Sequence, residues 1–473
     1  MTENTLFPPS NNIISENDRV MILIPSGGLR TVQMKLGGII NLGKFGQFLV
    51  DNIIGYPYGQ SFEILEDKKV QPIKSLSFGL EERDSSNTED STKESTPVPE
   101  AFISSLTNKD LVDKGSDIQK LTVEEIEKLK TEGGGNDIAK QIIEKMIQSH
   151  GAFDKKTIFS QEKYLTRKQK KFSRRFTVLK ISPYNMLSYL YQEKEPARVL
   201  DMSEETLGLL LSHADVRPGG NYLLMDETGG LIVYALMERM QGQGTITLLH
   251  ENDQPKLNLL DQVGFTEEQI ESIVHPVNLL QFLYPEEERA KNYKPSDEGI
   301  EGFPENKKAL HFKRLRKYHL LNDTLDLVEK NNFDGFISVC TLNPTTLLPK
   351  VLPRIGGSRS IVVYSQFKEI LVGLNDAMMK DKNVLMCNIY ESKVRKYQTI
   401  PGRLHPLMTS RAGGGFIFWG LRVFPKEGII AVGRGMNKGG KKQKLNTGDA
   451  KSSKTSTEQA IEDPDDVDIV IKS

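Results

Sequence analysis

Several features are scarce in this sequence, and each absence excludes a class of protein. Only 2 cysteines occur in 473 residues, each inside an apolar run, so Cys340 and Cys387 are expected to be buried, reduced thiols rather than part of a disulfide framework. No apolar run approaches the length of a membrane-spanning helix, and the N-terminal residues lack the pattern of a secretory signal. Lys plus Arg (62) nearly balances Asp plus Glu (63), so net charge predicts no partner. A soluble cytosolic or nuclear protein is expected.

Composition divides the chain into six segments. Residues 1–17 are expected to be a disordered N-terminus, and 18–80 a small β-barrel domain of short strands with glycine bends. An acidic, Ser/Thr-rich linker, 81–107, has almost no core-forming residues. A helical, basic connecting segment, 108–176, begins with a capping box of Thr122 and Glu125 and continues with a helix whose apolar face carries Ile142, Ile143 and Met146. The last 40 residues, 434–473, are expected to be a disordered tail.

Strands alternate with helical patterns over residues 177–433, apart from a polar excursion at 284–308. The predicted strands include TVLKIS, ARVLDM, NYLLMD, TITLLHE, FDGFISVC and SIVVYS, and this alternation is typical of a doubly wound α/β fold. VLMCNIYES and GGGFIFWGLRVF then predict a C-terminal antiparallel hairpin. A mostly parallel sheet closed by such a hairpin is the Rossmann-like pattern of class I methyltransferases.

The turn after NYLLMD is where such a fold usually meets its cofactor, at a glycine-rich loop before a helix. Here the turn is Asp226, Glu227, Thr228, Gly229 and Gly230, so two carboxylates stand where glycines are expected. Glu251 and Asp253, after the next strand, could still face a ribose. A degenerate turn that binds nothing is favoured over a residual cofactor site.

The end of FDGFISVC is the second place where such enzymes carry chemistry. The chain continues Cys340-Thr341-Leu342-Asn343-Pro344, which offers no carboxylate to a base amine and is interpreted as a turn. His405 is interpreted as a structural histidine. No Cys/His spacing for a metal, and no GxSxG, Walker A or HExxH motif, occurs in the sequence.

The strongest positive signal is a run of cations with interleaved aromatic residues at 160–176. No acidic residue interrupts the seven cations, which are Lys163, Arg167, Lys168, Lys170, Lys171, Arg174 and Arg175. Because such charges repel one another unless a polyanion neutralises them, a phosphate-backbone contact is favoured over a solvated charged face. Phe172 and Phe176 are interpreted as core anchors.

Several stretches in order resemble one known family. Residues 41–64, 160–172, 176–183, 227–240, 401–406 and 412–420 are together similar to the non-catalytic subunit of the eukaryotic tRNA N1-methyladenosine methyltransferase. The resemblance runs from about residue 18 to 433. It implies that this subunit has lost its S-adenosylmethionine site, that a catalytic partner subunit binds the cofactor, and that two copies of each form a nuclear heterotetramer. That complex methylates N1 of adenine 58 in the tRNA T-loop.

The resemblance also implies where tRNA is contacted: the loop around Asn108–Gln119, the basic helix, Tyr191–Arg198 and two C-terminal loops. The candidate tRNA-binding residues are Asn108, Lys109, Lys114, Lys163, Tyr164, Arg167, Lys168, Lys170, Lys171, Arg174, Lys194, Arg198, Arg403 and Arg411. No catalytic residue, bound cofactor or metal is expected in this chain. Two alternatives remain open: an active S-adenosylmethionine-dependent RNA methyltransferase, and an RNA-binding scaffold or translation factor.

Overall fold

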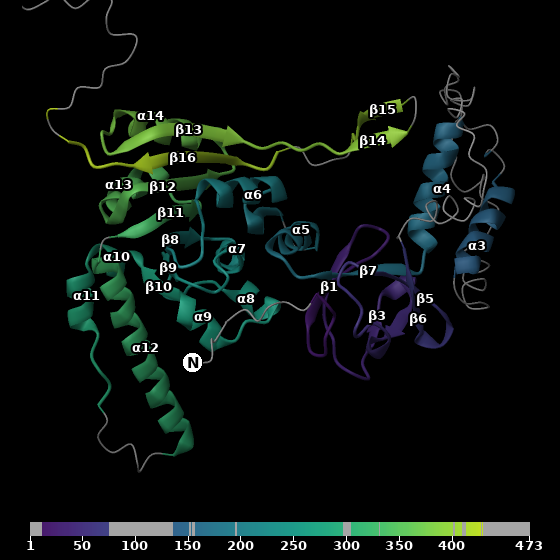
Figure 1. The fold of residues 1–473 in the computed structure, drawn as a ribbon, viewed down its shortest axis with the longest axis horizontal. Helices are drawn as coiled ribbons and strands as arrows, with labels where there is room; N and C mark the ends of the chain where they lie inside the picture. Colours follow the sequence, from purple (N-terminus) through teal and green to yellow (C-terminus); the bar gives the residue numbers. More distant parts are fainter. Residues whose placement is uncertain are drawn as a thin grey trace, which may run out of the picture. The chain divides into compact units, whose positions relative to one another are not determined.

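The computed structural model describes residues 12–74, 136–150, 153, 157–193, 196–296, 304–330, 332–400, 403–408, 413–426 and 428 (Figure 1). Contacts divide the chain into Met1–Pro425 and Lys426–Ser473, and the architecture below is that of the first unit. The predicted linker 81–107, the capping box of Thr122 and Glu125 and the tail 434–473 lie outside the described residues. Residues 12–17, expected to be disordered, are instead ordered, because Ile14 is 1% exposed and its carbonyl accepts a hydrogen bond from Gly55.

The N-terminal strands form an open antiparallel sheet of five strands in the order β2-β1-β7-β5-β6. Its members are β1 (Arg19–Leu23), β2 (Leu29–Gln33), β5 (Ser61–Ile64), β6 (Val70–Ile73) and β7 (Arg175–Lys180). A separate hairpin joins β3 (Ile39–Asn41) to β4 (Gln47–Leu49). The core is aromatic: Phe48 stacks on Phe176 at 4.3 Å, and Phe62 lies beside them. A small antiparallel domain is therefore confirmed, although the described strands do not close into a barrel.

The chain leaves this sheet after β6 and returns to it as β7. Between them lie two packed helices, α3 (Asn136–Gln148) and α4 (Ile158–Phe172). The prediction that TVLKIS starts the α/β sheet was therefore wrong, because β7 pairs antiparallel with β1 and β5. The sequence shows that TVLKIS has strand character, but it does not show which strand it pairs with. Its partner β5 is more than a hundred residues away in the chain. The helical, basic segment is thus an insertion between two strands of the N-terminal sheet.

The second sheet has the order β10-β9-β8-β11-β12-β16-β13. Neighbours from β10 to β12 are parallel, whereas β16 runs antiparallel to both β12 and β13. The strands are β8 (Asn221–Asp226), β9 (Thr245–His250), β10 (Val274–Asn278), β11 (Phe333–Val339), β12 (Ile355–Ser365), β13 (Val384–Glu391) and β16 (Phe416–Arg422). The predicted Rossmann-like sheet with a C-terminal antiparallel hairpin is confirmed. A short hairpin, β14 (Tyr397–Ile400) and β15 (Arg403–Pro406), separates β13 from β16.

Helices cover both faces of this sheet because alternate strand residues point to opposite sides. Leu224 and Leu248 join a core with α5, α6, α7 and α8, whereas Leu223 and Leu249 join one with α12, α13 and α14. The helices on the first face are α5 (Pro183–Glu193), α6 (Glu204–His213), α7 (Leu231–Arg239) and α8 (Asn258–Val263). The remaining helices are α9 (Glu267–Ile273), α10 (Leu279–Leu283), α11 (Pro285–Lys291), α12 (Glu305–Glu329), α13 (Pro344–Val351) and α14 (Lys368–Lys380).

Three details differ from expectation. ARVLDM is not a strand: Pro196–Val199 form a short 3-10 helix, and Leu200 and Asp201 follow in the left-handed region. Strand β10 was missed because it contains Pro276, which is tolerated here since β10 lies at the sheet edge. The polar excursion 284–308 contains α11 and the start of α12.

The two cysteines are free thiols, as expected, but both are half-buried rather than buried. Burial raises the pKa of Cys340 to about 11, so this thiol is protonated at neutral pH. Within the described ranges, no helix has the length and apolar character needed to cross a membrane. No cluster of His, Cys, Asp and Glu that could hold a metal ion occurs in that part of the chain.

Candidate nucleic-acid interface and the turn after β8

The turn after β8 is closed by the side chain of Asp226. One carboxylate oxygen accepts hydrogen bonds from the amide of Thr228 (2.7 Å) and its hydroxyl (2.5 Å). The other accepts from the amides of Ile232 (3.1 Å) and Val233 (3.2 Å), in the first turn of α7. These two amides are donors that an uncapped helix N-terminus offers to an anion. Asp226 therefore supplies from within the chain the negative charge that a ligand would bring.

The neighbouring residues of the turn are engaged as well. Glu227 accepts hydrogen bonds from the amide (3.0 Å) and hydroxyl (2.9 Å) of Thr341, which joins the ends of β8 and β11. The carbonyl oxygen of Gly229 accepts a hydrogen bond from the amide of Leu259 (3.2 Å). A Cβ placed on Gly230 would lie 3.4 Å from the Cα of Leu257. Leu257 therefore covers the turn. The start of α8 and the residue before it thus pack directly against the two remaining glycines.

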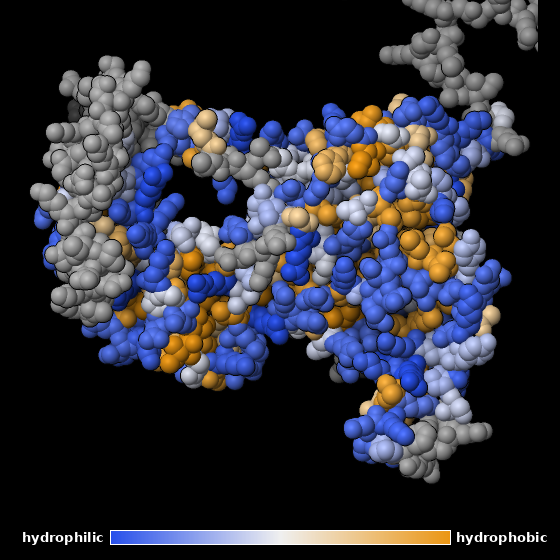
Figure 2. All heavy atoms as spheres, turned by 180° about the vertical axis from the view of Figure 1, so that it is seen from behind, coloured by the Kyte–Doolittle hydropathy of each residue, from blue (hydrophilic) through white to orange (hydrophobic). Residues whose placement is uncertain are grey.

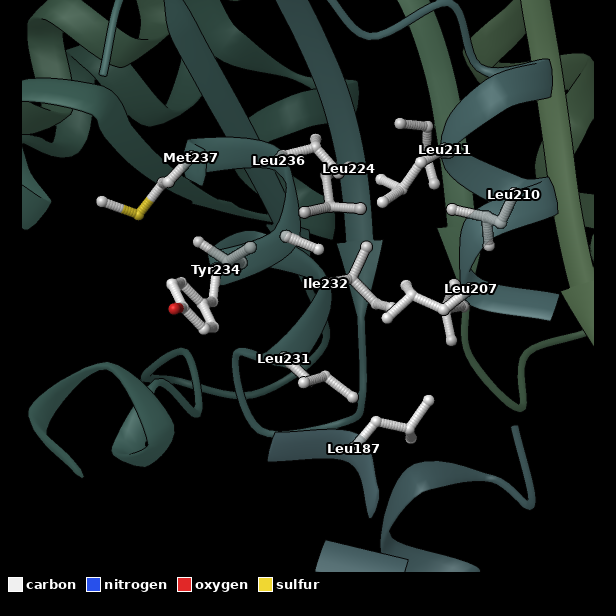
Figure 3. Packing of buried hydrophobic residues seen from close by; sticks show 14 of the residues in the cluster. Leu187, Leu207, Leu210, Leu211, Leu224, Leu231, Ile232, Tyr234, Leu236 and Met237 are labelled. Atoms are coloured by element: carbon white, nitrogen blue, oxygen red, sulfur yellow. The ribbon is translucent and has the colours of Figure 1, made fainter. Parts of the chain in front are cut away.

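Helix α7 holds this turn in place because most of its residues are buried. Every residue from Leu231 to Met237 is buried. Figure 3 shows Ile232 pointing toward Leu207 of α6 and Leu231 lying near Leu187 of α5. Although part of Asp226 reaches solvent, burial of its carboxyl raises the pKa of that group, and the hydrogen bonds from Thr228, Val233 and Ile232 act in the opposite direction. The turn is consequently a packed structural element.

The residues present do not fit the carboxylate end of S-adenosylmethionine. A second carboxylate at the start of α7 would compete with Asp226 for the same amides and be repelled by it at close range. Glu251 is exposed just after β9, where a ribose would be held. The charges of Glu227 and Glu251 both contribute to raising the pKa of the Cys340 thiol. An acidic residue thus follows β9, whereas the amides at the start of α7 are bound by a side chain of the protein itself.

The second predicted place for chemistry is a helix cap. The side-chain oxygen of Asn343 accepts a hydrogen bond from the amide of Thr345 (3.0 Å), and Pro344 is the first residue of α13. Asn343 and Pro344 are therefore the N-cap and first residue of α13 rather than the turn that was expected. His405 is exposed on β15, with its Nδ1 2.9 Å from the carbonyl of Pro406.

The basic run 160–172 forms the amphipathic helix α4. Phe172 is 9% exposed and packs with Ile142, Ile143 and Met146 of α3, and Leu165 lies against the same cluster. The predicted roles of Phe172 and Phe176 as core anchors are both confirmed, in two different cores. One face of α4 is thereby fixed to α3, and the opposite face is turned to solvent.

Three cations share that solvent face. Lys163, Arg167 and Lys170 are exposed and follow one another at spacings of four and three residues, which places them side by side on a helix. In the described part of the chain, none of the three has an acidic partner. Lys171 is exposed next to them, with its ammonium 5.5 Å from the ring of Phe172. We name Lys163, Arg167 and Lys170 the α4 face.

Tyr164 and Lys168 lie to one side of the α4 face and are half-buried. The ring of Tyr164 meets His150 at 5.3 Å and Phe153 at 5.7 Å edge-on, and the ammonium of Lys168 lies 5.0 Å from its centre. Burial, followed by the charge of Lys171, lowers the pKa of Lys168. Tyr164 and Lys168 therefore belong to the contact between α4 and the end of α3 rather than to the exposed surface of α4.

The last two cations of the run are separated from the α4 face. Arg174 is half-buried after the end of the helix, and its carbonyl accepts a hydrogen bond from Ile64 (2.9 Å). Arg175 is 1% exposed in β7, with its guanidinium 3.9 Å from the carboxylate of Glu63, which is also buried. Counting Arg175 among the phosphate-binding cations was wrong, because the strand turns its side chain into the N-terminal sheet.

The other candidate residues are dispersed. Arg198 lies beside the closed turn, its guanidinium 3.8 Å from the position of a Cβ on Gly229. Tyr191 lines a pocket of about 390 Å³ with residues of α5, the start of α6 and Lys396. Arg403 lies on β15, paired with Ile400. The structure does not describe Asn108, Lys109, Lys114, Lys194 and Arg411.

Comparisons with known proteins match this architecture to a family. The family model of Gcd10p matches residues 13–307. The chain is 51% identical over 436 residues to the tRNA (adenine(58)-N(1))-methyltransferase non-catalytic subunit of Debaryomyces hansenii, covering 92% of each chain. It is 40% identical to the protein of the same name from Eremothecium gossypii, covering 87% of this chain and 93% of that protein. A solved tRNA (m1A58) methyltransferase from Aquifex aeolicus is similar with a TM-score of 0.42 and 9% identity, covering 88% of this chain and 100% of that chain. The chain belongs to the Gcd10p family.

Proposed function

We propose that this chain is the non-catalytic, tRNA-binding subunit of the methyltransferase complex that forms N1-methyladenosine at position 58 in the tRNA T-loop. The observation that carries the proposal is the turn after β8, where Asp226 takes the amides of Ile232 and Val233. A chain of methyltransferase fold whose cofactor turn is closed by its own carboxylate needs a partner to perform methyl transfer. The names of its relatives as non-catalytic subunits support the same conclusion.

In this proposal the two subunits divide the work. The catalytic partner binds S-adenosylmethionine and receives the adenine in its pocket, which requires the base to leave the stack. This chain holds the tRNA by its phosphates, with the α4 face as the principal described contact. The segment from Asn108 to Lys114 and the residues Arg403 and Arg411 are also proposed to contact tRNA.

The complex is further proposed to be a nuclear heterotetramer with two copies of each subunit. To test this, the complex is purified from isolated nuclei through a tag on this chain and weighed by native mass spectrometry. The expected mass is that of two copies of this chain plus two copies of a second, methyltransferase-type chain. A one-to-one heterodimer would disprove the stoichiometry, and recovery from the cytosolic fraction alone would disprove the nuclear location.

Calorimetric titration of the complex with S-adenosylmethionine is expected to give one bound cofactor per heterodimer. Glu251→Ala in this chain should change neither the number of sites nor their affinity, because the partner holds the only cofactor. The matched control replaces the acidic residue at the corresponding strand end of the partner, which should abolish the signal. Two cofactors per heterodimer, one of them lost in Glu251→Ala, would favour an active methyltransferase instead.

A further inference from the structure

Helix α12 is long, and only its C-terminal turns carry buried residues. It runs for 25 residues from Glu305 to Glu329, and its buried residues are Thr324, Leu325 and Val328, all in the last turns. Figure 1 shows the N-terminal half of α12 extending away from α10 and β10, and Figure 2 shows mostly hydrophilic atoms over this end of the helix. The exposed half therefore gains little stability from the hydrophobic core.

Charge is segregated along α12. Between Glu305 and Asp323 the helix has no acidic residue and carries six cations, which are Lys307, Lys308, Lys313, Arg314, Arg316 and Lys317. The acidic residues Asp326 and Glu329 are in the packed half, where both pair with Arg289 of α11 at 2.7 and 3.0 Å. The exposed half is thus strongly basic in a chain whose formal net charge is −1.

Some of these cations have structural partners and others do not. Lys308 lies 3.8 Å from Glu305, and Arg316 pairs with Glu271 of α9. Lys313, Arg314 and Lys317 are exposed, and none has an acidic partner among the residues that the structure describes. Lys317 is four residues after Lys313 and three after Arg314, so it neighbours both of them on one side of the helix. We name these three residues the α12 face.

This arrangement works against the stability of the helix. Like charges at these spacings cost about 0.2 to 0.5 kcal/mol per pair. Two further cations, Lys307 and Lys308, lie in the first turn of α12, where the macrodipole favours negative groups. An extended polyanion that follows the helix would relieve both costs at once.

We propose that the α12 face is a second contact for the RNA phosphate backbone, separate from the α4 face. The inference rests on the proposed function, which makes tRNA the RNA concerned. Phe312, 58% exposed beside these cations, gives the same end of the helix a ring on which an unpaired base can stack. The contact positions tRNA and carries no sequence information.

The test measures tRNA binding by the purified complex over a series of salt concentrations. The variant is Lys313→Ala, Arg314→Ala and Lys317→Ala together, and its slope of log affinity against log salt should be lower by about 2 to 3 units. The matched control removes three exposed lysines from α13, α14 and the residues after them, with Lys350→Ala, Lys368→Ala and Lys382→Ala. Since the substituted side chains of α12 contribute nothing to the core, circular dichroism should show an unchanged helix content.

If the salt slope of the α12 variant equals that of the control, the proposal is overturned. The same result is expected if the α12 face binds an acidic protein rather than RNA. Failure of this inference is distinct from failure of the proposed function. If only this inference fails, the wild-type complex and the control bind tRNA with the same salt slope. The α12 variant then has that slope too, whereas the slope of the α4 variant is lower. In the second case the wild-type complex itself binds tRNA no better than unrelated RNA of equal length. If the two faces contact different phosphates, the slope changes of the α4 and α12 variants should add.

Discussion

Asp226→Ala is expected to lower the free energy of unfolding of this chain by about 2 to 3 kcal/mol. The substitution removes the acceptor for the amides of Thr228, Ile232 and Val233, and buried donors without a partner are costly. It also removes the negative charge at the positive end of α7, which lies in the core. The loss is therefore larger than for an ordinary exposed N-cap.

Pulse proteolysis of the complex in urea measures this effect, because the surviving band of each subunit is read separately. Asp226→Asn keeps one acceptor oxygen and should fall between wild type and alanine. Asp253→Ala, an exposed carboxylate in the following loop, is the control and should shift stability by less than about 0.5 kcal/mol. Equal midpoints for Asp226→Ala and Asp253→Ala would show that the carboxylate does not hold the turn closed.

The sequence predicts the α/β sheet well because its signals are local. Apolar runs mark the strands, and the final hairpin follows from two β-rich segments around a Gly/Pro stretch. Pairing over long distances is different. TVLKIS has the same character whether it joins the N-terminal sheet or the α/β sheet, and only the folded chain shows that Phe176 stacks on Phe48. Strand β10 was hidden by Pro276, whose meaning depends on the strand being at an edge.

The candidate sites show the same division between local and tertiary information. Two carboxylates distinguish the turn after β8 from a glycine-rich loop, but the sequence does not show that Asp226 accepts hydrogen bonds from the first amides of α7. The cation run likewise predicts a basic helix, yet residue counting cannot separate Arg167, which faces solvent, from Arg175, which pairs with Glu63. That distinction depends on where α4 ends and β7 begins.

Replacing the α4 face is expected to cause the largest loss of tRNA binding. The structure selects Lys163→Ala, Arg167→Ala and Lys170→Ala, since these three residues are exposed on one side of the helix, whereas Lys168 is half-buried over Tyr164. If each contacts a phosphate, the salt slope should fall by about 2 to 3 units and affinity at low salt by about one to two orders of magnitude. The triple alanine variant at Lys350, Lys368 and Lys382 is the control for the removed charge.

Two further readouts separate a positioning role from damage to the complex. The loss should be similar for all tRNAs, because phosphate contacts do not read sequence. S-adenosylmethionine affinity should not change, and turnover at saturating tRNA should fall less than the apparent tRNA affinity, because the chemistry takes place in the partner. The core face of α4, with Leu165 and Phe172 against α3, is untouched by the substitutions, so the helix pair should remain folded. An unchanged salt slope in this variant would mean that the α4 face is only a solvated charged surface and that tRNA is held elsewhere.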